Sequence, residues 1–250
     1  MNIENIRQDI AKSERDNIEK TKKRFSKHIG LIEKQHECLL EFLVNFSYEN
    51  LKITINQNAY LIIFSLFADM IKKERLCIEL IQKGYYSEAG SLLRTIFDHY
   101  SHILYLSKYP ADWEKWIQYN NYQMDKVEGK NPQKPNNVFL KPTDQFLDLI
   151  GKKDYYRLYR KLSGYIHTSS DVLHGNFTPL PPSGQIYHYA PRFIEDKSEF
   201  LLNILFGFIN ESIWLGLNKT MEFSKVPESL EKYKETQEDV AKCFDKFYLT

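Results

Sequence analysis

Two side chains that could act together on a phosphate group are those of Arg160 and His167, which stand seven positions apart. In an α-helix this spacing places the two side chains within about 20° of each other around the helix axis, so they lie on one face. Gly164 between them leaves that face open. A histidine near its ordinary pKa can take the proton of a ribose 2′-hydroxyl, which then attacks the neighbouring phosphate without a metal. The arginine would neutralise the charge that develops on the phosphate oxygens. The pair predicts cleavage of RNA, and a solvated polar helix face is the plainer interpretation.

Other polar side chains of the same segment are candidate contacts to the RNA. Arg157 and Lys161 would add positive charge for its phosphates. Ser163 could donate a hydrogen bond, and Tyr156 falls on the same side of the helix.

The opposite side of this helix is apolar. Leu158, Leu162 and Tyr165 cluster about 180° from Arg160 when each residue turns the helix by 100°. We therefore expect these three side chains to be buried and the Arg160 face to point away from the core of its own chain. Such a face is either solvated or completed by a second chain or a ligand.

The spacing of Arg160 and His167 resembles the Arg-x(4–6)-His signature of the HEPN superfamily. Further similarity, to a bacterial branch of that superfamily, lies in Tyr156, Tyr159, Leu162 and Ser163, and earlier in Tyr85–Ala89, Leu93–Arg94 and Phe97–Asp98. The resemblance extends over residues 57 to 223, approximately.

This resemblance implies a four-helix bundle that often forms a homodimer, with the Arg/His faces meeting at the subunit interface. It also implies a metal-independent RNase of a toxin–antitoxin or phage-defence system, with an antitoxin or another defence protein as partner. Other members of the superfamily only bind nucleotide, RNA or a partner protein. Active members usually carry Asn, Asp or His after the arginine, whereas this chain has Lys161. The binding module therefore remains the second interpretation.

Arg94 and Asp98 lie one helical turn apart on an earlier predicted helix. They could form an ion pair that orients the site, or an ordinary pair on the helix surface.

Three pairs of residues have a spacing that suits metal ligands on a helix: Glu33 with His36, His99 with His102, and Asp171 with His174. A di-metal carboxylate bundle would need two Glu-x-x-His motifs and two further glutamates, and the chain has one such motif. We expect no metal and no cofactor, and keep a metal-binding bundle as a third interpretation.

Composition narrows the class of protein. The chain has 250 residues, of which 42% are hydrophobic, so it can form a sizeable core. The net charge of +1 argues against a protein that coats nucleic acid. The first residues do not resemble a signal peptide, and no run of about 18 apolar residues is present. We therefore expect a cytoplasmic protein without a membrane span.

Hydrophobic periodicity predicts an all-α protein, an up-and-down four-helix bundle of the HEPN type with additional N- and C-terminal helices. We divide it into an N-terminal helical extension, 1–50, and the bundle, 51–250. The predicted helices are 3–46, 57–82, 88–106, one that begins at Pro110, 143–150, 154–167, 200–223 and 228–247. The first is charged up to about residue 27. Ser87 is predicted to cap the helix 88–106, and Asp196 and Glu199 are predicted to form a capping box before the helix 200–223. The proline-rich segment 176–192 is predicted to be a loop.

Overall fold

The computed structural model describes residues 2–45, 57–166, 177–180, 184–187 and 190–221. These residues are predominantly α-helical, which confirms the predicted class. The predicted domain boundary at residue 50 and the predicted helix 228–247 lie outside them.

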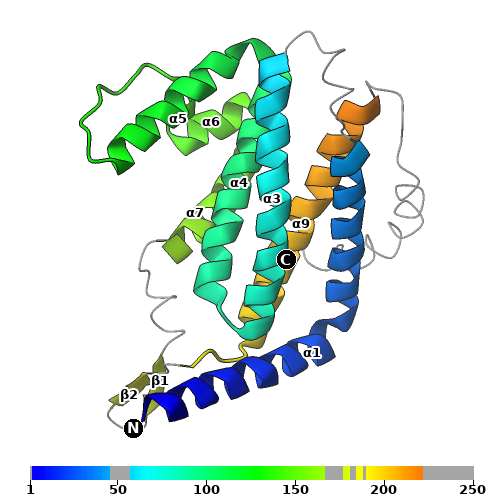
Figure 1. Cartoon of the computed structure of the whole chain (residues 1–250), viewed down its shortest axis with the longest axis vertical. Helices are drawn as coiled ribbons and strands as arrows, with labels where there is room; N and C mark the ends of the chain where they lie inside the picture. Colours follow the sequence, from blue (N-terminus) through cyan, green and yellow to red (C-terminus); the bar gives the residue numbers. More distant parts are fainter. Residues whose placement is uncertain (1, 46–56, 167–176, 181–183, 188–189, 222–250) are drawn as a thin grey trace.

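Long helices form the body of the molecule (Figure 1). They are α1 (Ile3–Asn45), α3 (Gln57–Lys83), α4 (Tyr86–Lys108) and α9 (Glu195–Met221). Helix α3 packs against α4, and both also contact α9, while α1 contacts α3 and α9.

The turn between α3 and α4 is built on Gly84, which has a positive φ of 89°. The Tyr85 backbone N–H donates to the carbonyl of Leu80 at 2.9 Å, which satisfies one of the free carbonyls at the end of α3. The predicted helices 57–82 and 88–106 are therefore confirmed as α3 and α4, which form a hairpin with Gly84 at its turn. Ser87 is not its cap, because α4 already begins at Tyr86.

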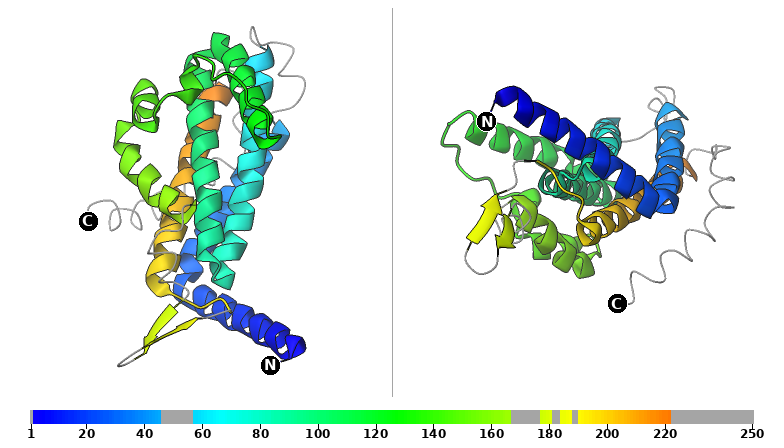
Figure 2. Two further views of the ribbon diagram at one scale, coloured as in Figure 1. Left: turned by 90° about the vertical axis from the view of Figure 1, so that its left-hand side faces the viewer. Right: turned by 90° about the horizontal axis from the view of Figure 1, so that it is seen from below.

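Helix α1 changes direction at Phe25, whose φ of −118° and ψ of 24° are not helical. Its first half crosses beneath the other helices, as the view from below in Figure 2 shows. There Asn17 Nδ2 donates to the carbonyl of Lys83 at 2.9 Å, and the Tyr85 hydroxyl donates to Glu14 at 2.8 Å. The second half runs beside α3 and α9. The charged half and the apolar half predicted from the sequence thus have different surroundings.

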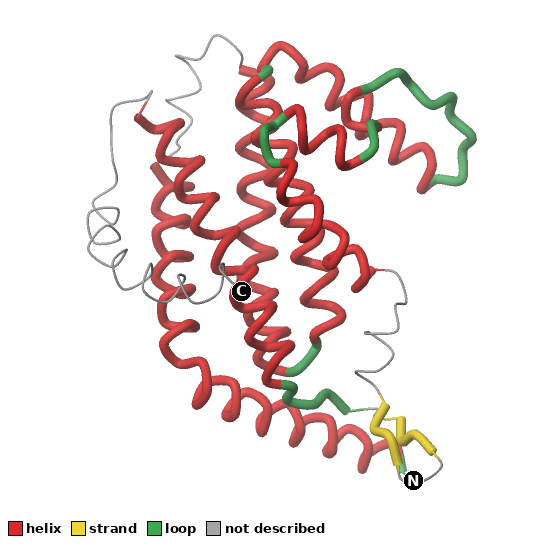
Figure 3. Tube along the Cα trace, turned by 180° about the vertical axis from the view of Figure 1, so that it is seen from behind, coloured by secondary structure: helices red, strands yellow, loops and turns green. Residues whose placement is uncertain are grey.

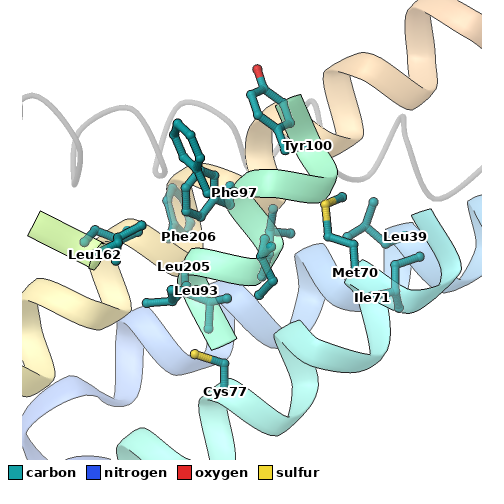
Figure 4. Close-up of a cluster of buried hydrophobic side chains, with 14 of the residues drawn as sticks. Leu39, Met70, Ile71, Cys77, Leu93, Phe97, Tyr100, Leu162, Leu205 and Phe206 are labelled. Atoms are coloured by element: carbon teal, nitrogen blue, oxygen red, sulfur yellow. The ribbon is translucent and has the colours of Figure 1, made fainter. Parts of the chain in front are cut away.

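The core lies between these helices and α7 (Tyr156–Ile166) (Figure 4). Its centre is made of apolar side chains: Leu39 of α1, Met70, Ile71 and Cys77 of α3, Leu93, Phe97 and Tyr100 of α4, Leu162 of α7, and Leu205 and Phe206 of α9. Each fully buried side chain of this size stabilises the fold by roughly 1.5–3 kcal/mol.

One carboxyl group, that of Glu74 on α3, is enclosed in this apolar surrounding. The residue is 0% exposed, and neither carboxyl oxygen has a hydrogen-bond partner among the described residues. Burial raises its pKa well above the ordinary value, because the charged form loses its hydration.

A helical arm leaves the end of α4. It consists of the 3₁₀ turn η1 (Pro110–Asp112), α5 (Trp113–Val127), the 3₁₀ turn η2 (Val138–Leu140) and α6 (Thr143–Leu149). An aromatic cluster of His102, Tyr105, Tyr119, Phe139 and Phe146 joins this arm to α4. The arm projects beside the body in Figure 1.

Two short strands follow α7 and stand at one end of the molecule (Figure 3). Strands β1 (Phe177–Leu180) and β2 (Gly184–Tyr187) pair antiparallel. The prediction of a loop over 176–192 is therefore wrong for these strands. A proline is tolerated in a two-stranded hairpin, because each strand leaves one side without a partner.

Helix α9 begins at Glu195, so the predicted capping box of Asp196 and Glu199 is wrong, since both residues lie inside the helix. No helix among the described residues combines the length and the apolar content that crossing a membrane requires.

Candidate functional site

Helix α7 carries most of the predicted site and packs against α4. Figure 1 shows it on the side of α4 opposite to the second half of α1. Leu162 is fully buried, and Leu158 and Tyr165 are half-buried against the core. The predicted apolar side of this helix is therefore confirmed.

The side chains of Arg157, Arg160 and Lys161 are exposed, as predicted for the other side of α7. We call these three residues the cationic face. Like charges three and four positions apart destabilise a helix by roughly 0.2–0.5 kcal/mol per pair, so the cationic face would be stabilised by a bound anion. Lys161 also places its Nζ 5.3 Å from the centre of the Phe200 ring on α9.

The charge is concentrated in a short stretch. Residues 152–161 carry five basic side chains and one acidic side chain, whereas the whole chain is nearly neutral at +1. A local positive field of this kind attracts polyanions even when the net charge of a protein is small.

Arg94 of α4 lies beneath α7 rather than at the surface, with 9% of its area exposed. Its guanidinium carbon lies 4.0 Å from the centre of the Tyr159 ring, within the range of a cation–π contact. Its Nε donates to the Ser163 hydroxyl at 3.3 Å, and that hydroxyl donates to the Tyr159 carbonyl at 2.9 Å. Arg94, predicted to orient the site, and Ser163, predicted to donate a hydrogen bond to the RNA, therefore contact each other across the α4–α7 interface.

The predicted ion pair between Arg94 and Asp98 is present. Burial raises the pKa of the Asp98 carboxyl, although the neighbouring Arg94 favours the charged form. The pair therefore holds the guanidinium in place under Tyr159.

Tyr159 belongs to the motif that suggested the family, yet sequence reasoning gave it no role. Its ring is stacked on that of Tyr156, with the centroids 6.1 Å apart and the planes inclined by 11°. Burial raises the pKa of the Tyr159 hydroxyl, but hydrogen bonds with Thr143 and Arg94 outweigh burial and leave it lowered. The sequence signal for this contact is that Tyr156 and Tyr159 stand three positions apart, a spacing that places two side chains next to each other on a helix.

A second polar network, also missed, lies where η3 (Lys153–Tyr155) leads into α7. The buried Tyr100 donates its hydroxyl proton to Glu211 at 2.5 Å, and Lys152 pairs with the same carboxylate at 3.0 Å. Burial favours a higher pKa for Glu211, but these two partners outweigh burial and lower it. The network ties the start of α7 to α4 and α9.

His167, the predicted general base, lies outside the described residues, as do Asp171 and His174. Arg160 is therefore the described member of the predicted catalytic pair.

Two of the remaining candidate metal ligands, His99 and His102, have other surroundings. His99 Nδ1 lies 3.4 Å from Asp69 Oδ2, and the His102 ring packs edge-on against Tyr119, Phe139 and Phe146. In the part of the chain that the structure describes, no group of three His, Cys, Asp or Glu side chains could hold a metal ion.

Comparison with known proteins finds a match in the middle of the chain to a family other than the predicted one. Residues 60–143 match the model of a family described as "Family of unknown function (DUF5677)", and no HEPN family was found. The predicted membership of the HEPN superfamily is therefore wrong. The short Arg/His motif that suggested it lies beyond the matched segment, which ends at the start of α6. Searches of curated proteins and of solved structures gave no match.

Proposed function

We propose that this chain binds RNA through α7 and cleaves it without a metal. The observation that carries the proposal is the cationic face, where three exposed cations lie within little more than one helical turn. The phosphates of an RNA strand are one chemical group that matches such a row.

Each cation of the cationic face has a distinct part in binding. The planar guanidinium groups of Arg157 and Arg160 can each hold two oxygens of one phosphate, whereas Lys161 acts as a point charge. The stacked tyrosines and the Tyr100–Glu211–Lys152 network hold the first turn of α7 in position.

For the cleavage step, His167 takes the proton of the ribose 2′-hydroxyl. The 2′-oxygen then forms a bond to phosphorus as the bond to the 5′-oxygen breaks, and the leaving 5′-oxygen takes a proton from water. The products are a 2′,3′-cyclic phosphate and a 5′-hydroxyl. Arg160 would stabilise the extra negative charge of the transition state.

End-labelled RNA incubated with the protein in EDTA tests both parts. We expect cleavage with cyclic phosphate ends, reduced by at least about a hundred-fold in His167→Ala and in Arg160→Ala. RNA affinity should fall about ten-fold in Arg157→Ala/Lys161→Ala. The control Lys126→Ala/Lys134→Ala removes two exposed cations of the arm and should bind as the wild type does.

Equal cleavage by the wild type and His167→Ala would refute the catalytic part. Equal affinity of the cationic-face variant and the arm variant would refute RNA binding at α7.

A second candidate function is a module that binds RNA, a nucleotide or a partner protein without cleaving it. The observation that favours it is the network of Arg94, Asp98 and Ser163, in which the Arg94 guanidinium supports α7 from beneath rather than facing solvent. Under this function, His167→Ala would leave affinity unchanged and no cyclic phosphate would form.

We also propose that the chain forms a homodimer and acts in a toxin–antitoxin or phage-defence system. Two copies joined through their α7 helices would bring two cationic faces together, which a shared RNA strand would neutralise. Sedimentation with and without RNA tests the dimer, and the growth of cells that express wild type or His167→Ala tests toxicity.

A further inference from the structure

Tyr156 is the outermost member of a series of ring contacts that starts in the core. Phe208 and Phe97, both nearly fully buried, are in edge contact with centroids 5.7 Å apart. Phe97 lies 5.9 Å from Tyr159, and Tyr159 is stacked on Tyr156. The series thus leads from the centre of the bundle to an exposed ring on α7.

Tyr159, the neighbour of Tyr156 in this series, is held from several directions. The Arg94 guanidinium lies against the Tyr159 ring at 4.0 Å and is itself fixed by Asp98 and Ser163. Because Tyr159 is fixed in this way, Tyr156 loses little conformational freedom when a ligand stacks on it.

The free surface of Tyr156 is large for an aromatic residue, at 38% of its area. Tyr159 is stacked on this ring, and the residue remains open to solvent at the surface of α7. Arg160 follows Tyr156 by four positions and so lies one turn along the same side of α7. A flat apolar ring next to exposed cations is the combination that single-stranded nucleic acids bind.

We infer that Tyr156 is a stacking platform for an unpaired base, so that α7 selects single-stranded RNA over duplex RNA. A base in a duplex is already stacked on both sides and cannot reach the ring. This inference rests on the proposed RNA binding and adds the class of RNA to it. Tyr159 and Arg94 are positioning residues in this arrangement, since they act through Tyr156.

Three probes separate base stacking from phosphate binding. They are an oligouridylate of about twelve nucleotides, a ribose-phosphate strand of the same length without bases, and an RNA duplex of the same length. Affinities are measured by fluorescence anisotropy with the full chain carrying His167→Ala, so that cleavage does not consume the probe.

We expect Tyr156→Ala to weaken binding of the oligouridylate about ten-fold or more and to leave binding of the strand without bases unchanged. Tyr156→Trp should bind the oligouridylate at least as tightly as the parent, because a larger ring stacks better. The parent should bind the oligouridylate more tightly than the duplex.

Tyr109→Ala is the matched control. Tyr109 is exposed to the same degree, at 39%, and a lysine Nζ lies 5.4 Å from its ring, but it is at the end of α4. Its removal should change none of the three affinities.

Two results would overturn the inference. One is that Tyr156→Ala and Tyr109→Ala bind the oligouridylate with equal affinity. The other is that Tyr156→Ala loses as much affinity for the strand without bases as for the oligouridylate. A failure of the proposed function looks different. In that case Arg157→Ala/Lys161→Ala would bind every probe as tightly as the parent.

Discussion

The Tyr165 ring on α7 lies over Gly90 of α4, so close that a Cβ added at Gly90 would come within 2.3 Å of its Cγ. Helix α7 therefore depends on a missing side chain in α4 for its position. Gly90→Ala should displace Tyr165 and lower the free energy of unfolding by about 1–3 kcal/mol, as measured by urea denaturation.

Gly30→Ala is the control for this prediction. Gly30 also lies inside a helix, and a Cβ there would meet nothing within 4 Å. Its replacement should raise the stability by up to about 1 kcal/mol, because alanine favours the helix. Equal effects of the two substitutions would contradict the close approach at Gly90.

Alanine substitutions at Gly84 and at Gly129 distinguish the cost of backbone strain from the cost of steric crowding. Both have positive φ, 89° and 76°, but a Cβ at Gly84 would lie 2.8 Å from the Arg192 carbonyl oxygen and from Asn17 Nδ2, whereas Gly129 is open. Gly129→Ala should cost about 1–2 kcal/mol through its left-handed conformation. Gly84→Ala should cost clearly more in the same urea experiment, and an equal cost would show that both Arg192 and Asn17 yield at this contact.

Glu74 should make stability fall as the pH rises. Its folded pKa lies above the ordinary value of 4.5, so the folded chain retains a proton that the unfolded chain releases. The contribution of Glu74 to the free energy of unfolding is therefore fully present below about pH 4.5. It declines as the pH rises from there until the raised pKa is passed. Glu74→Gln should abolish this decline, and Glu74→Met should raise stability by about 1–3 kcal/mol at neutral pH.

The exposed Glu79→Gln on the same helix should leave the pH profile unchanged. If the profile of Glu74→Gln follows that of the wild type, Glu74 is not the group responsible.

His102 should make the stability rise with pH in the acid range, which is opposite to the effect of Glu74. Burial lowers its pKa from 6.5 to about 3, and the neighbouring His99 and Arg94 act in the same direction. The unfolded chain therefore binds the proton first, and stability is lost as the pH falls from about 6.5 towards 3. Imidazole NMR should find His102 neutral at pH 5, and His102→Phe should remove this slope. Protonation near pH 6 would contradict the enclosed environment.

Local features were predictable from sequence, and contacts between distant segments were not. The Gly84 turn and the buried side of α7 follow from conformational preference and from a period of 3.6 residues, which act within a few positions. The position of Arg94 under Tyr159 joins residues far apart in sequence, and no periodicity reports what lies opposite a helix. The hairpin of β1 and β2 was missed because its strands are short and one contains a proline.

The family assignment failed for a related reason. Two residues at a helical spacing, Arg160 and His167, occur by chance in many helices, whereas a family model weighs a whole segment such as 60–143.

The crossing of α1 beneath the bundle has a consequence for the order of folding. Its first half contacts Lys83, Pro191 and Glu195, so its partners lie up to 178 positions later in the chain. During synthesis at about 5–20 residues per second, it waits roughly 9 to 36 seconds for a partner 178 positions later. The many charged side chains between residues 3 and 24 keep this helix hydrated during the wait, so it docks after the hairpin that it closes.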